Sequence, residues 1–178
     1  SNGLRIRRLY GLLLSNDLGR KTNLQRGSCA EKGGNPMAKM NVTLCGVPLD
    51  NPIIPASGTF GFGYEFADIY DINILGSISC KGTTAEERFG NPLPRIAECP
   101  SGMINSVGLQ NPGVERVLKE ELPKLSQCFS KPIMANISGF SVDEYRTVCQ
   151  KLDAYPQIGW FEVNISCPNV HGGGMSFG

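Results

Sequence analysis

Short apolar runs alternate with amphipathic stretches along the chain from Met40 onward. Four of these runs are almost continuous and rich in β-branched residues, namely 53–58 (IIPASG), 74–84 (ILGSISCKGTT), 132–139 (PIMANISG) and 160–169 (WFEVNISCPN). Continuous runs of this kind are typical of parallel strands that are covered on both faces. The pattern therefore predicts four buried strands.

The intervening amphipathic stretches predict three helices, over residues 63–71, 113–125 and 141–152, with Pro123 near the end of the second. In the third, Ser141 is followed three residues later by Glu144, which is a capping pattern at a helix start. One face of this helix would carry its larger side chains, namely Val142, Tyr145, Val148, Cys149 and Leu152.

Two further stretches are rich in turn-forming residues. Residues 41–52 (NVTLCGVPLDNP) predict a small hairpin that is punctuated by Gly46 and Pro48. Residues 94–113 (PRIAECPSGMINSVGLQNPG) predict an excursion loop with room for a second small hairpin.

Each predicted strand ends in small polar residues, as in PASG, SCKGTT, ANISG and NISCPN. In a βα-barrel the carboxyl ends of the strands converge on one mouth, where their side chains meet a common ligand. We therefore predict an α/β fold, a (β/α)8 TIM barrel, present here as an incomplete half-barrel of about four βα units. The fourth strand of such a half-barrel would expose an unpaired edge.

Composition places the chain among globular proteins, with 40% hydrophobic and 19% charged residues. No apolar run approaches the roughly 18 residues that a membrane-spanning helix requires. The seven cysteines are an odd number, contain no CxxC pair and are accompanied by one histidine. These features favour free thiols in a reduced, cytoplasmic setting over disulfides, a zinc site or an iron–sulfur site.

The charge is distributed unevenly along the chain. Residues 1–39 hold eight lysines and arginines against two acidic residues, whereas residues 40–178 hold nine against fourteen. We expect 1–39 to be a basic leader, a disordered tag or upstream translation, and 40–178 to be the barrel domain. An organelle address or a nucleic-acid-binding arm is the alternative for the leader.

The predicted mouth carries amides, hydroxyls, one amine and one thiol, from Ser57, Lys81, Thr83, Thr84, Asn105, Asn136, Asn164, Cys167 and Asn169. This set holds no carboxylate pair and no metal cluster, which disfavours glycosidases and metal-dependent hydrolases. Amides suit a flat heterocycle that has both carbonyl and N–H edges. A lysine suits a substrate carboxylate or an electron-rich flavin nitrogen. Taken singly, each Asn or Ser also fits a cap or turn, and Cys167 a core thiol.

Several motifs occur in order along residues 40–178: ASGTFGFG (56–63), CKGTT (80–84), NSVGLQNPG (105–113), ANISG (135–139) and NISCPNVHGGGMSFG (164–178). Together they resemble dihydroorotate dehydrogenase, in particular the type 1B catalytic subunit, which passes electrons to NAD through a partner. Class 2 relatives have serine where this chain has Cys167, so SCPN favours class 1. The glycine-rich HGGGMSFG stretch favours type 1B over type 1A.

The resemblance implies a barrel with FMN on its carboxyl face that oxidises (S)-dihydroorotate to orotate in pyrimidine (UMP) biosynthesis. A hydride passes from C6 to FMN, and Cys167 is the base for the C5 proton. By motif position, the FMN contacts are Ala56, Ser57, Lys81, Gly82, Asn136 and Asn164. The substrate contacts are Lys81, Asn105, Ser106, Val107, Gly108, Leu109, Asn164 and Asn169.

The family also implies a partner subunit that carries FAD and a [2Fe–2S] cluster, in a hetero-oligomer built on a homodimer. No metal, nucleic acid or membrane contact is expected for this chain itself. The family's FMN phosphate site lies on strands five to eight, so this chain alone is expected to be inactive and to bind FMN weakly. The alternatives are a dihydropyrimidine dehydrogenase-like FMN enzyme, which reduces uracil or thymine, and a truncated, non-catalytic fragment.

Overall fold

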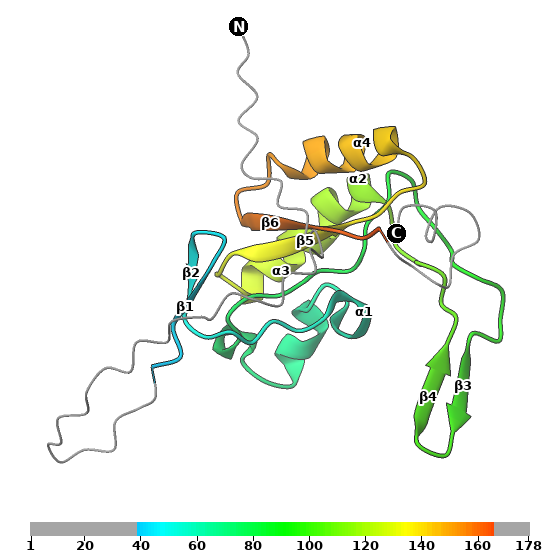
Figure 1. Cartoon of the computed structure of the whole chain (residues 1–178), viewed down its shortest axis with the longest axis horizontal. Helices are drawn as coiled ribbons and strands as arrows, with labels where there is room; N and C mark the ends of the chain where they lie inside the picture. Colours follow the sequence, from blue (N-terminus) through cyan, green and yellow to red (C-terminus); the bar gives the residue numbers. More distant parts are fainter. Residues whose placement is uncertain (1–38, 166–178) are drawn as a thin grey trace, which may run out of the picture.

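A computed structural model describes residues 39–165 of the chain (Figure 1). Its strands are β1 (Val42–Leu44), β2 (Val47–Leu49), β3 (Ile96–Cys99), β4 (Gly102–Asn105), β5 (Ile133–Ile137) and β6 (Ile158–Val163). Its α-helices are α1 (Ser57–Phe60), α2 (Val114–Arg116), α3 (Leu122–Cys128) and α4 (Val142–Leu152). Two short 3-10 helices, η1 (Tyr64–Asp68) and η2 (Ile72–Ile74), and a π-helical turn, η3 (Val117–Glu121), complete the set.

The centre of the fold is the parallel pair β5–β6, in which Met134 is opposite Trp160 and Asn136 is opposite Glu162. Backbone hydrogen bonds add two extended segments on the other side of β5. The N–H groups of Cys80 and Thr83 donate to β5 at 2.9 Å each, and the Gly76 N–H donates to the Ile53 carbonyl at 2.9 Å. The four apolar runs thus lie side by side in chain order.

The prediction is wrong for the first two of the four strands, because neither run forms a regular strand. The run 53–58 already turns into α1 at Ser57, and the run 74–84 contacts β5 only through isolated bridges at Ser79 and Thr83. Proline has no N–H to donate to a ladder, and 53–58 contains Pro55. The N–H groups of 76–83 donate to three different neighbours, namely the 53–55 segment, Gly61 and β5. The Lys81 N–H, for example, donates to Gly61 rather than to β5.

The helix predicted over 113–125 extends further than expected. It is continuous through α2, η3 and α3 to Cys128, and Pro123 lies in the first turn of α3 rather than near the end. Pro123 has no N–H to donate within this continuous helix, and the π-helical turn η3 ends two residues before it. The stretch 63–71 forms the five-residue 3-10 helix η1, which begins after Gly63 at φ 91°.

The capping pattern of α4 is confirmed. The Ser141 hydroxyl accepts a hydrogen bond from the Glu144 N–H at 3.2 Å, and the Glu144 carboxylate accepts one from the Phe140 N–H. Val148 and Leu152 are buried, but Val142 is 67% exposed, contrary to its predicted place on the apolar face. Val142 is the first residue after the cap.

Replacing Ser141 with alanine is expected to lower the free energy of unfolding by about 1 kcal/mol, because the Glu144 N–H loses its side-chain acceptor. Denaturant unfolding would measure the change. Ser101→Ala, in the exposed β3–β4 turn, is the matched control. Equal stability of the two variants would show that the cap contributes nothing.

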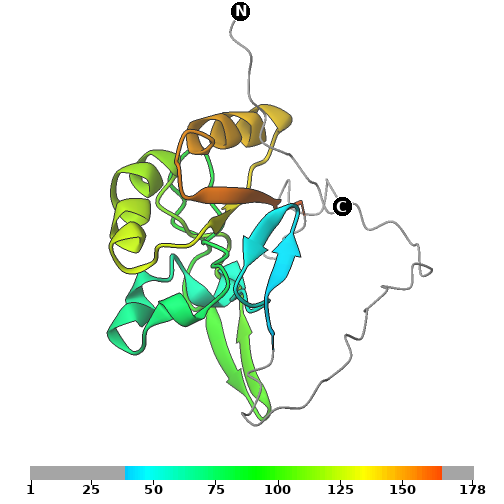
Figure 2. The same ribbon diagram turned by 90° about the vertical axis from the view of Figure 1, so that its left-hand side faces the viewer.

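The two faces of β5–β6 differ in chemistry. Side chains from one face join the helices in the apolar core, which includes Ile133, Ala135, Ile137, Phe161, Leu122, Leu125, Val148 and Leu152. The other face carries polar groups, and the Ser79 hydroxyl donates to the Glu162 carboxylate there at 2.5 Å. The helices lie on the core side of the sheet, and the β1–β2 hairpin lies on the other (Figure 2).

Both predicted hairpins are present. The turn between β1 and β2 has positive φ at Cys45 (48°) and Gly46 (83°), as a two-residue turn that matches the strand twist requires. The Trp160 indole N–H donates to the Leu44 carbonyl at 3.1 Å and so ties this hairpin to β6. The β3–β4 hairpin projects away from the body of the fold (Figure 1). Within 39–165, no helix has the length and apolar character needed to cross a bilayer.

Candidate functional site

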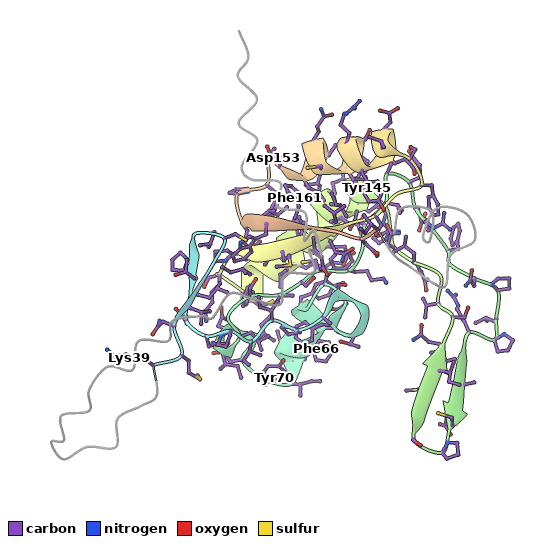
Figure 3. The ribbon with its side chains drawn as sticks, in the orientation of Figure 1. Lys39, Phe66, Tyr70, Tyr145, Asp153 and Phe161 are labelled. Carbon is purple, nitrogen blue, oxygen red and sulfur yellow. The ribbon has the colours of Figure 1, made fainter. Side chains whose placement is uncertain are left out.

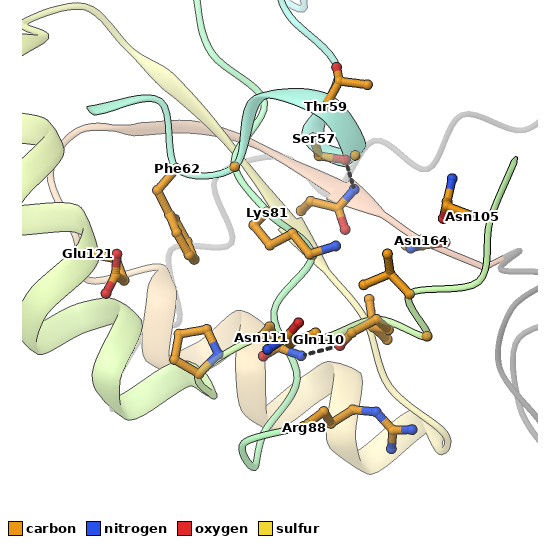
Figure 4. A pocket seen from close by; sticks show the side chains of 18 of the residues that line it. Ser57, Thr59, Phe62, Lys81, Arg88, Asn105, Gln110, Asn111, Glu121 and Asn164 are labelled. Atoms are coloured by element: carbon orange, nitrogen blue, oxygen red, sulfur yellow. Dashed lines mark hydrogen bonds between the residues drawn. The ribbon is translucent and has the colours of Figure 1, made fainter. Parts of the chain in front are cut away.

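A cavity of about 910 Å³ opens where the parallel segments end, between those ends and the 88–111 loop (Figure 4). Nine of the residues predicted from the motifs line it, namely Ser57, Lys81, Gly82, Asn105, Val107, Gly108, Leu109, Asn136 and Asn164. Ala56 and Ser106 do not line it, although each adjoins a residue that does. Cys167 and Asn169 lie outside the described residues.

Lys81 lies in the middle of the cavity (Figure 4), and Asn136 lines the cavity from the neighbouring strand β5. Asn136 is 4% exposed, and its amide donates to the Ser57 hydroxyl at 3.4 Å. Lys81 is half-buried, and its backbone N–H donates to the Gly61 carbonyl at 2.8 Å. A hydroxyl, an amide and an amine from three segments therefore face the same space.

Gly82 lets these groups approach one another. A Cβ at this position would lie 2.8 Å from the Asn136 Oδ1 and 3.1 Å from the Leu109 side chain. Any larger residue would push the strand end away from Asn136 or from the loop. The sequence placed Gly82 in the site by motif, and its backbone packing explains why glycine is needed.

Side chains from residues 91–95, in the first half of the same loop, hydrogen-bond to the part that carries Asn105 to Leu109. The Asn91 amide donates to the Ser106 carbonyl at 3.0 Å, and the Arg95 guanidinium donates to the Gln110 side chain at 3.1 Å. At Gly108, where φ is 77°, a Cβ would lie 2.6 Å from the Asn91 amide. Asn91 and Arg95 therefore set the path of the loop along the cavity wall.

Asn111 is a cavity residue that the sequence interpretation missed. It is 4% exposed, and its Oδ1 accepts from the backbone N–H of Thr84 at 3.1 Å and of Gly113 at 3.0 Å. Its Nδ2 donates to the Thr84 hydroxyl and to the Leu109 carbonyl, each at 2.9 Å. Asn111 thus joins the end of the loop to the segment that carries Lys81. The available signal was its place before Pro-Gly in NSVGLQNPG.

Glu121 was also missed, and it lines the cavity from the π-helical turn η3. It is 7% exposed and accepts a hydrogen bond from the Tyr64 hydroxyl at 2.7 Å. Burial, followed by this hydrogen bond, raises the pKa of Tyr64 well above its ordinary value, so the hydroxyl stays a donor. Sequence offers no signal here, because a glutamate among KEELPK resembles a solvated helix face.

The other charged groups of the cavity have both signs. Arg88 and Arg116 join Lys81, whereas Glu65 and Glu87 join Glu121. The Arg88 guanidinium lies 4.4 Å from the centre of the Phe140 ring. Residues 39–165 contain no group of three or more His, Cys, Asp or Glu side chains that could hold a metal ion. Beside these charged groups, the cavity offers amides, hydroxyls and an amine that suit a flat polar ligand.

Comparison with known proteins supports the motif resemblance. Residues 39–178 match the family model described as dihydroorotate dehydrogenase. The chain is 54% identical over 142 residues to the "dihydroorotate dehydrogenase B (NAD(+)), catalytic subunit" of Bacillus cytotoxicus, covering 80% of this chain and 46% of that protein. It is 54% identical over 144 residues to the protein of the same name from Enterococcus faecalis, with 81% and 45% covered. The chain thus spans about half the length of these curated relatives.

Two crystal structures of Eimeria tenella DHODH share the fold. The complex with ferulenol has a TM-score of 0.59 at 21% identity and covers 75% of this chain and 38% of that one. The ligand-free form has a TM-score of 0.56, also at 21% identity, with 75% and 40% covered. The predicted TIM-barrel class is thereby supported, while the half-barrel of four units stays a prediction, because the described strands form three two-stranded sheets.

The match to the type 1B catalytic subunit, first made on five motifs, is therefore confirmed by the family model and by relatives that carry this name. The chain belongs to the dihydroorotate dehydrogenase family.

Proposed function

We propose that this chain provides part of the active site of an FMN-dependent enzyme that oxidises dihydroorotate to orotate in pyrimidine biosynthesis. The observation that carries the proposal is the cavity at the strand ends, where nine residues of the predicted site come together. The names of the relatives add the substrate. We place the enzyme in the cytoplasm, in keeping with its free thiols.

The residues present fit FMN. A flavin ring has carbonyl and N–H edges, and the amides of Asn136 and Asn164 and the Ser57 hydroxyl offer matching donors and acceptors. Gly82 allows the backbone to come close to a flat ring, and Lys81 places a positive charge beside it. When bound, FMN supplies the acceptor for the hydride that leaves C6 of dihydroorotate.

The 88–111 loop would hold the substrate. Asn105, Val107, Gly108 and Leu109 line the cavity opposite the strand ends, and we assign Ser106 to the same contact surface. Asn105 can pair with the ring amides of dihydroorotate, and the Lys81 amine can attract its carboxylate. Asn164 would contact both ligands, and Asn169 would add a further substrate contact.

Cys167 would be the base that removes the proton from C5. It follows Asn164 by three residues, so covalent geometry keeps the two Cα atoms within about 11 Å of each other. Asn164 lines the cavity, so this limit is compatible with a thiol beside the ligand. An ordinary cysteine pKa near 8.5 allows a useful thiolate fraction once a polar site lowers it.

Electrons would leave toward NAD through a partner subunit with FAD and a [2Fe–2S] cluster, in a hetero-oligomer built on a homodimer. The words "catalytic subunit" in the relatives' names support a separate partner.

A substrate assay tests the proposal. A protein that contains this chain and the remaining βα units is expected to bind FMN and to bleach its absorbance when dihydroorotate is added. Uracil with NADPH is expected to give no turnover, because uracil lacks the carboxylate that Lys81 would bind. Turnover of uracil but not of dihydroorotate would instead support a dihydropyrimidine dehydrogenase-like enzyme. Absence of both activities would contradict the proposed function and favour a non-catalytic role for the chain.

A further inference from the structure

Tyr145 lies on α4 and is absent from the residues that line the cavity, but its hydroxyl connects two of the elements that build it. It donates a hydrogen bond to the Asn164 carbonyl, directly after β6. It also accepts one from the Gly139 backbone N–H, in the loop after β5. One side-chain atom therefore joins the carboxyl ends of two neighbouring parallel strands.

This bridge completes the anchoring of the Asn164 backbone. The Asn164 N–H donates to the Ile137 carbonyl at 2.9 Å, and its carbonyl accepts from Tyr145. With both polar backbone groups held, the direction of the side chain from its Cα is restricted. That side chain lines the cavity and points toward the region of Lys81 and Asn105 (Figure 4).

The Tyr145 ring also packs closely against the loop after β5. A Cβ on Gly139 would come within 3.3 Å of the Tyr145 Cδ2, so the backbone lies against the edge of the ring. Gly139 follows Asn136 by three residues, and Asn136 is another amide that lines the cavity. Tyr145 is labelled in Figure 3 between α4 and the end of β6.

We propose that Tyr145 is a positioning residue for this site, which acts by holding the Asn164 backbone and the Gly139 loop in a fixed relation. This proposal rests on the proposed function, because its consequence is the orientation of amides toward FMN and orotate. Tyr145 touches neither ligand. It restricts Asn164 at the start of the segment that leads to Cys167.

The chemistry of the bridge requires a neutral hydroxyl that donates and accepts at once. Burial raises the pKa of Tyr145 above its ordinary value, so the hydroxyl keeps its proton at neutral pH. Phenylalanine preserves the ring that packs on Gly139 but removes both hydrogen bonds. The Asn164 carbonyl and the Gly139 N–H would then lose this partner, and Asn164 could adopt other orientations.

Tyr145→Phe in the complete enzyme tests this role. The dissociation constant for orotate, followed through the absorbance of bound flavin, is expected to rise about tenfold, as the loss of the Tyr145 hydrogen bonds implies. The rate of flavin reduction by dihydroorotate is expected to fall by a similar factor. Hydrogen exchange at the backbone around Asn164 is expected to accelerate in the ligand-free protein.

Tyr155→Phe is the matched control, because Tyr155 is also half-buried and packs against the same core but does not line the cavity. It should bind orotate and reduce flavin as the wild type does. If Tyr145→Phe lowers only the melting temperature and leaves ligand affinity, reduction and exchange at Asn164 unchanged, the positioning role is wrong. If the wild type itself neither binds orotate nor reacts with dihydroorotate, the proposed function fails, and the exchange experiment still decides whether the bridge orders Asn164.

Discussion

Replacing Cys167 with serine in the complete enzyme is expected to slow reduction of bound FMN by dihydroorotate about 100- to 10,000-fold at neutral pH, the range typical for loss of a general base. Orotate affinity should stay close to that of the wild type, because the contacts that we assign to the substrate come from other residues. Stopped-flow absorbance of the flavin in a single turnover measures the first quantity. Titration with orotate measures the second.

The physical reason for this loss is the pKa of the base. A free thiol has a pKa near 8.5, and a polar site that stabilises the thiolate lowers this pKa. A serine hydroxyl stays protonated throughout the accessible pH range. The variant should therefore recover part of its rate at high pH, where hydroxide can remove the C5 proton. The wild type should reach its full rate once the thiolate is formed.

Cys99→Ser is the control for this substitution, because Cys99 is an exposed free thiol on β3 outside the cavity lining. It should reduce flavin at the wild-type rate. Unchanged kinetics in Cys167→Ser would instead assign Cys167 to the ordinary buried or surface thiols, and another base would have to be sought.

Replacing Asn111 with leucine is expected to lower the free energy of unfolding by about 3 kcal/mol or more. Leucine has a similar volume but cannot accept the hydrogen bonds from the Thr84 and Gly113 N–H groups or donate to the Leu109 carbonyl. Each buried polar group left without a partner costs about 1–3 kcal/mol. Because Asn111 is 4% exposed, water cannot readily replace its amide.

Thermal unfolding of the complete protein checks this prediction. Gln127→Leu, on the exposed side of α3, is the control and should change the melting temperature little. Asn111→Asp should be intermediate, because its carboxylate still accepts from the two N–H groups but no longer donates to Leu109 unless it is protonated. If Asn111→Leu had the same melting temperature as the control, the network around Asn111 would not hold the loop to the segment that carries Lys81.

The pattern of the chain located most of what surrounds the site. The hairpin at 41–52, the capped helix at 141–152 and the parallel strands around Ala135 and Phe161 follow from local rules that are readable in order along the sequence. Nine residues that the motifs assign to the site line one cavity, while their roles toward a ligand stay predictions. The motifs and the cavity coincide because the motif residues lie at the ends of the elements that the pattern identifies.

Other features depended on contacts that no local pattern encodes. The run 74–84 has the composition of a strand, but its N–H groups are divided among several neighbours, so it forms only isolated bridges with β5. Glu121 resembles a surface glutamate in sequence, but the π-helical turn directs it to Tyr64. Both outcomes depend on partners far away in the chain.

By itself, the sequence determined the order of the apolar runs and helices, the polar ends of those runs and the family, because these depend on side-chain period and on motifs that are contiguous in the chain. Only the tertiary structure decided that Asn111 joins two walls of the cavity and that Tyr145 joins the ends of β5 and β6. The physical reason is that a hydrogen bond between residues distant in sequence forms only when packing has brought donor and acceptor together.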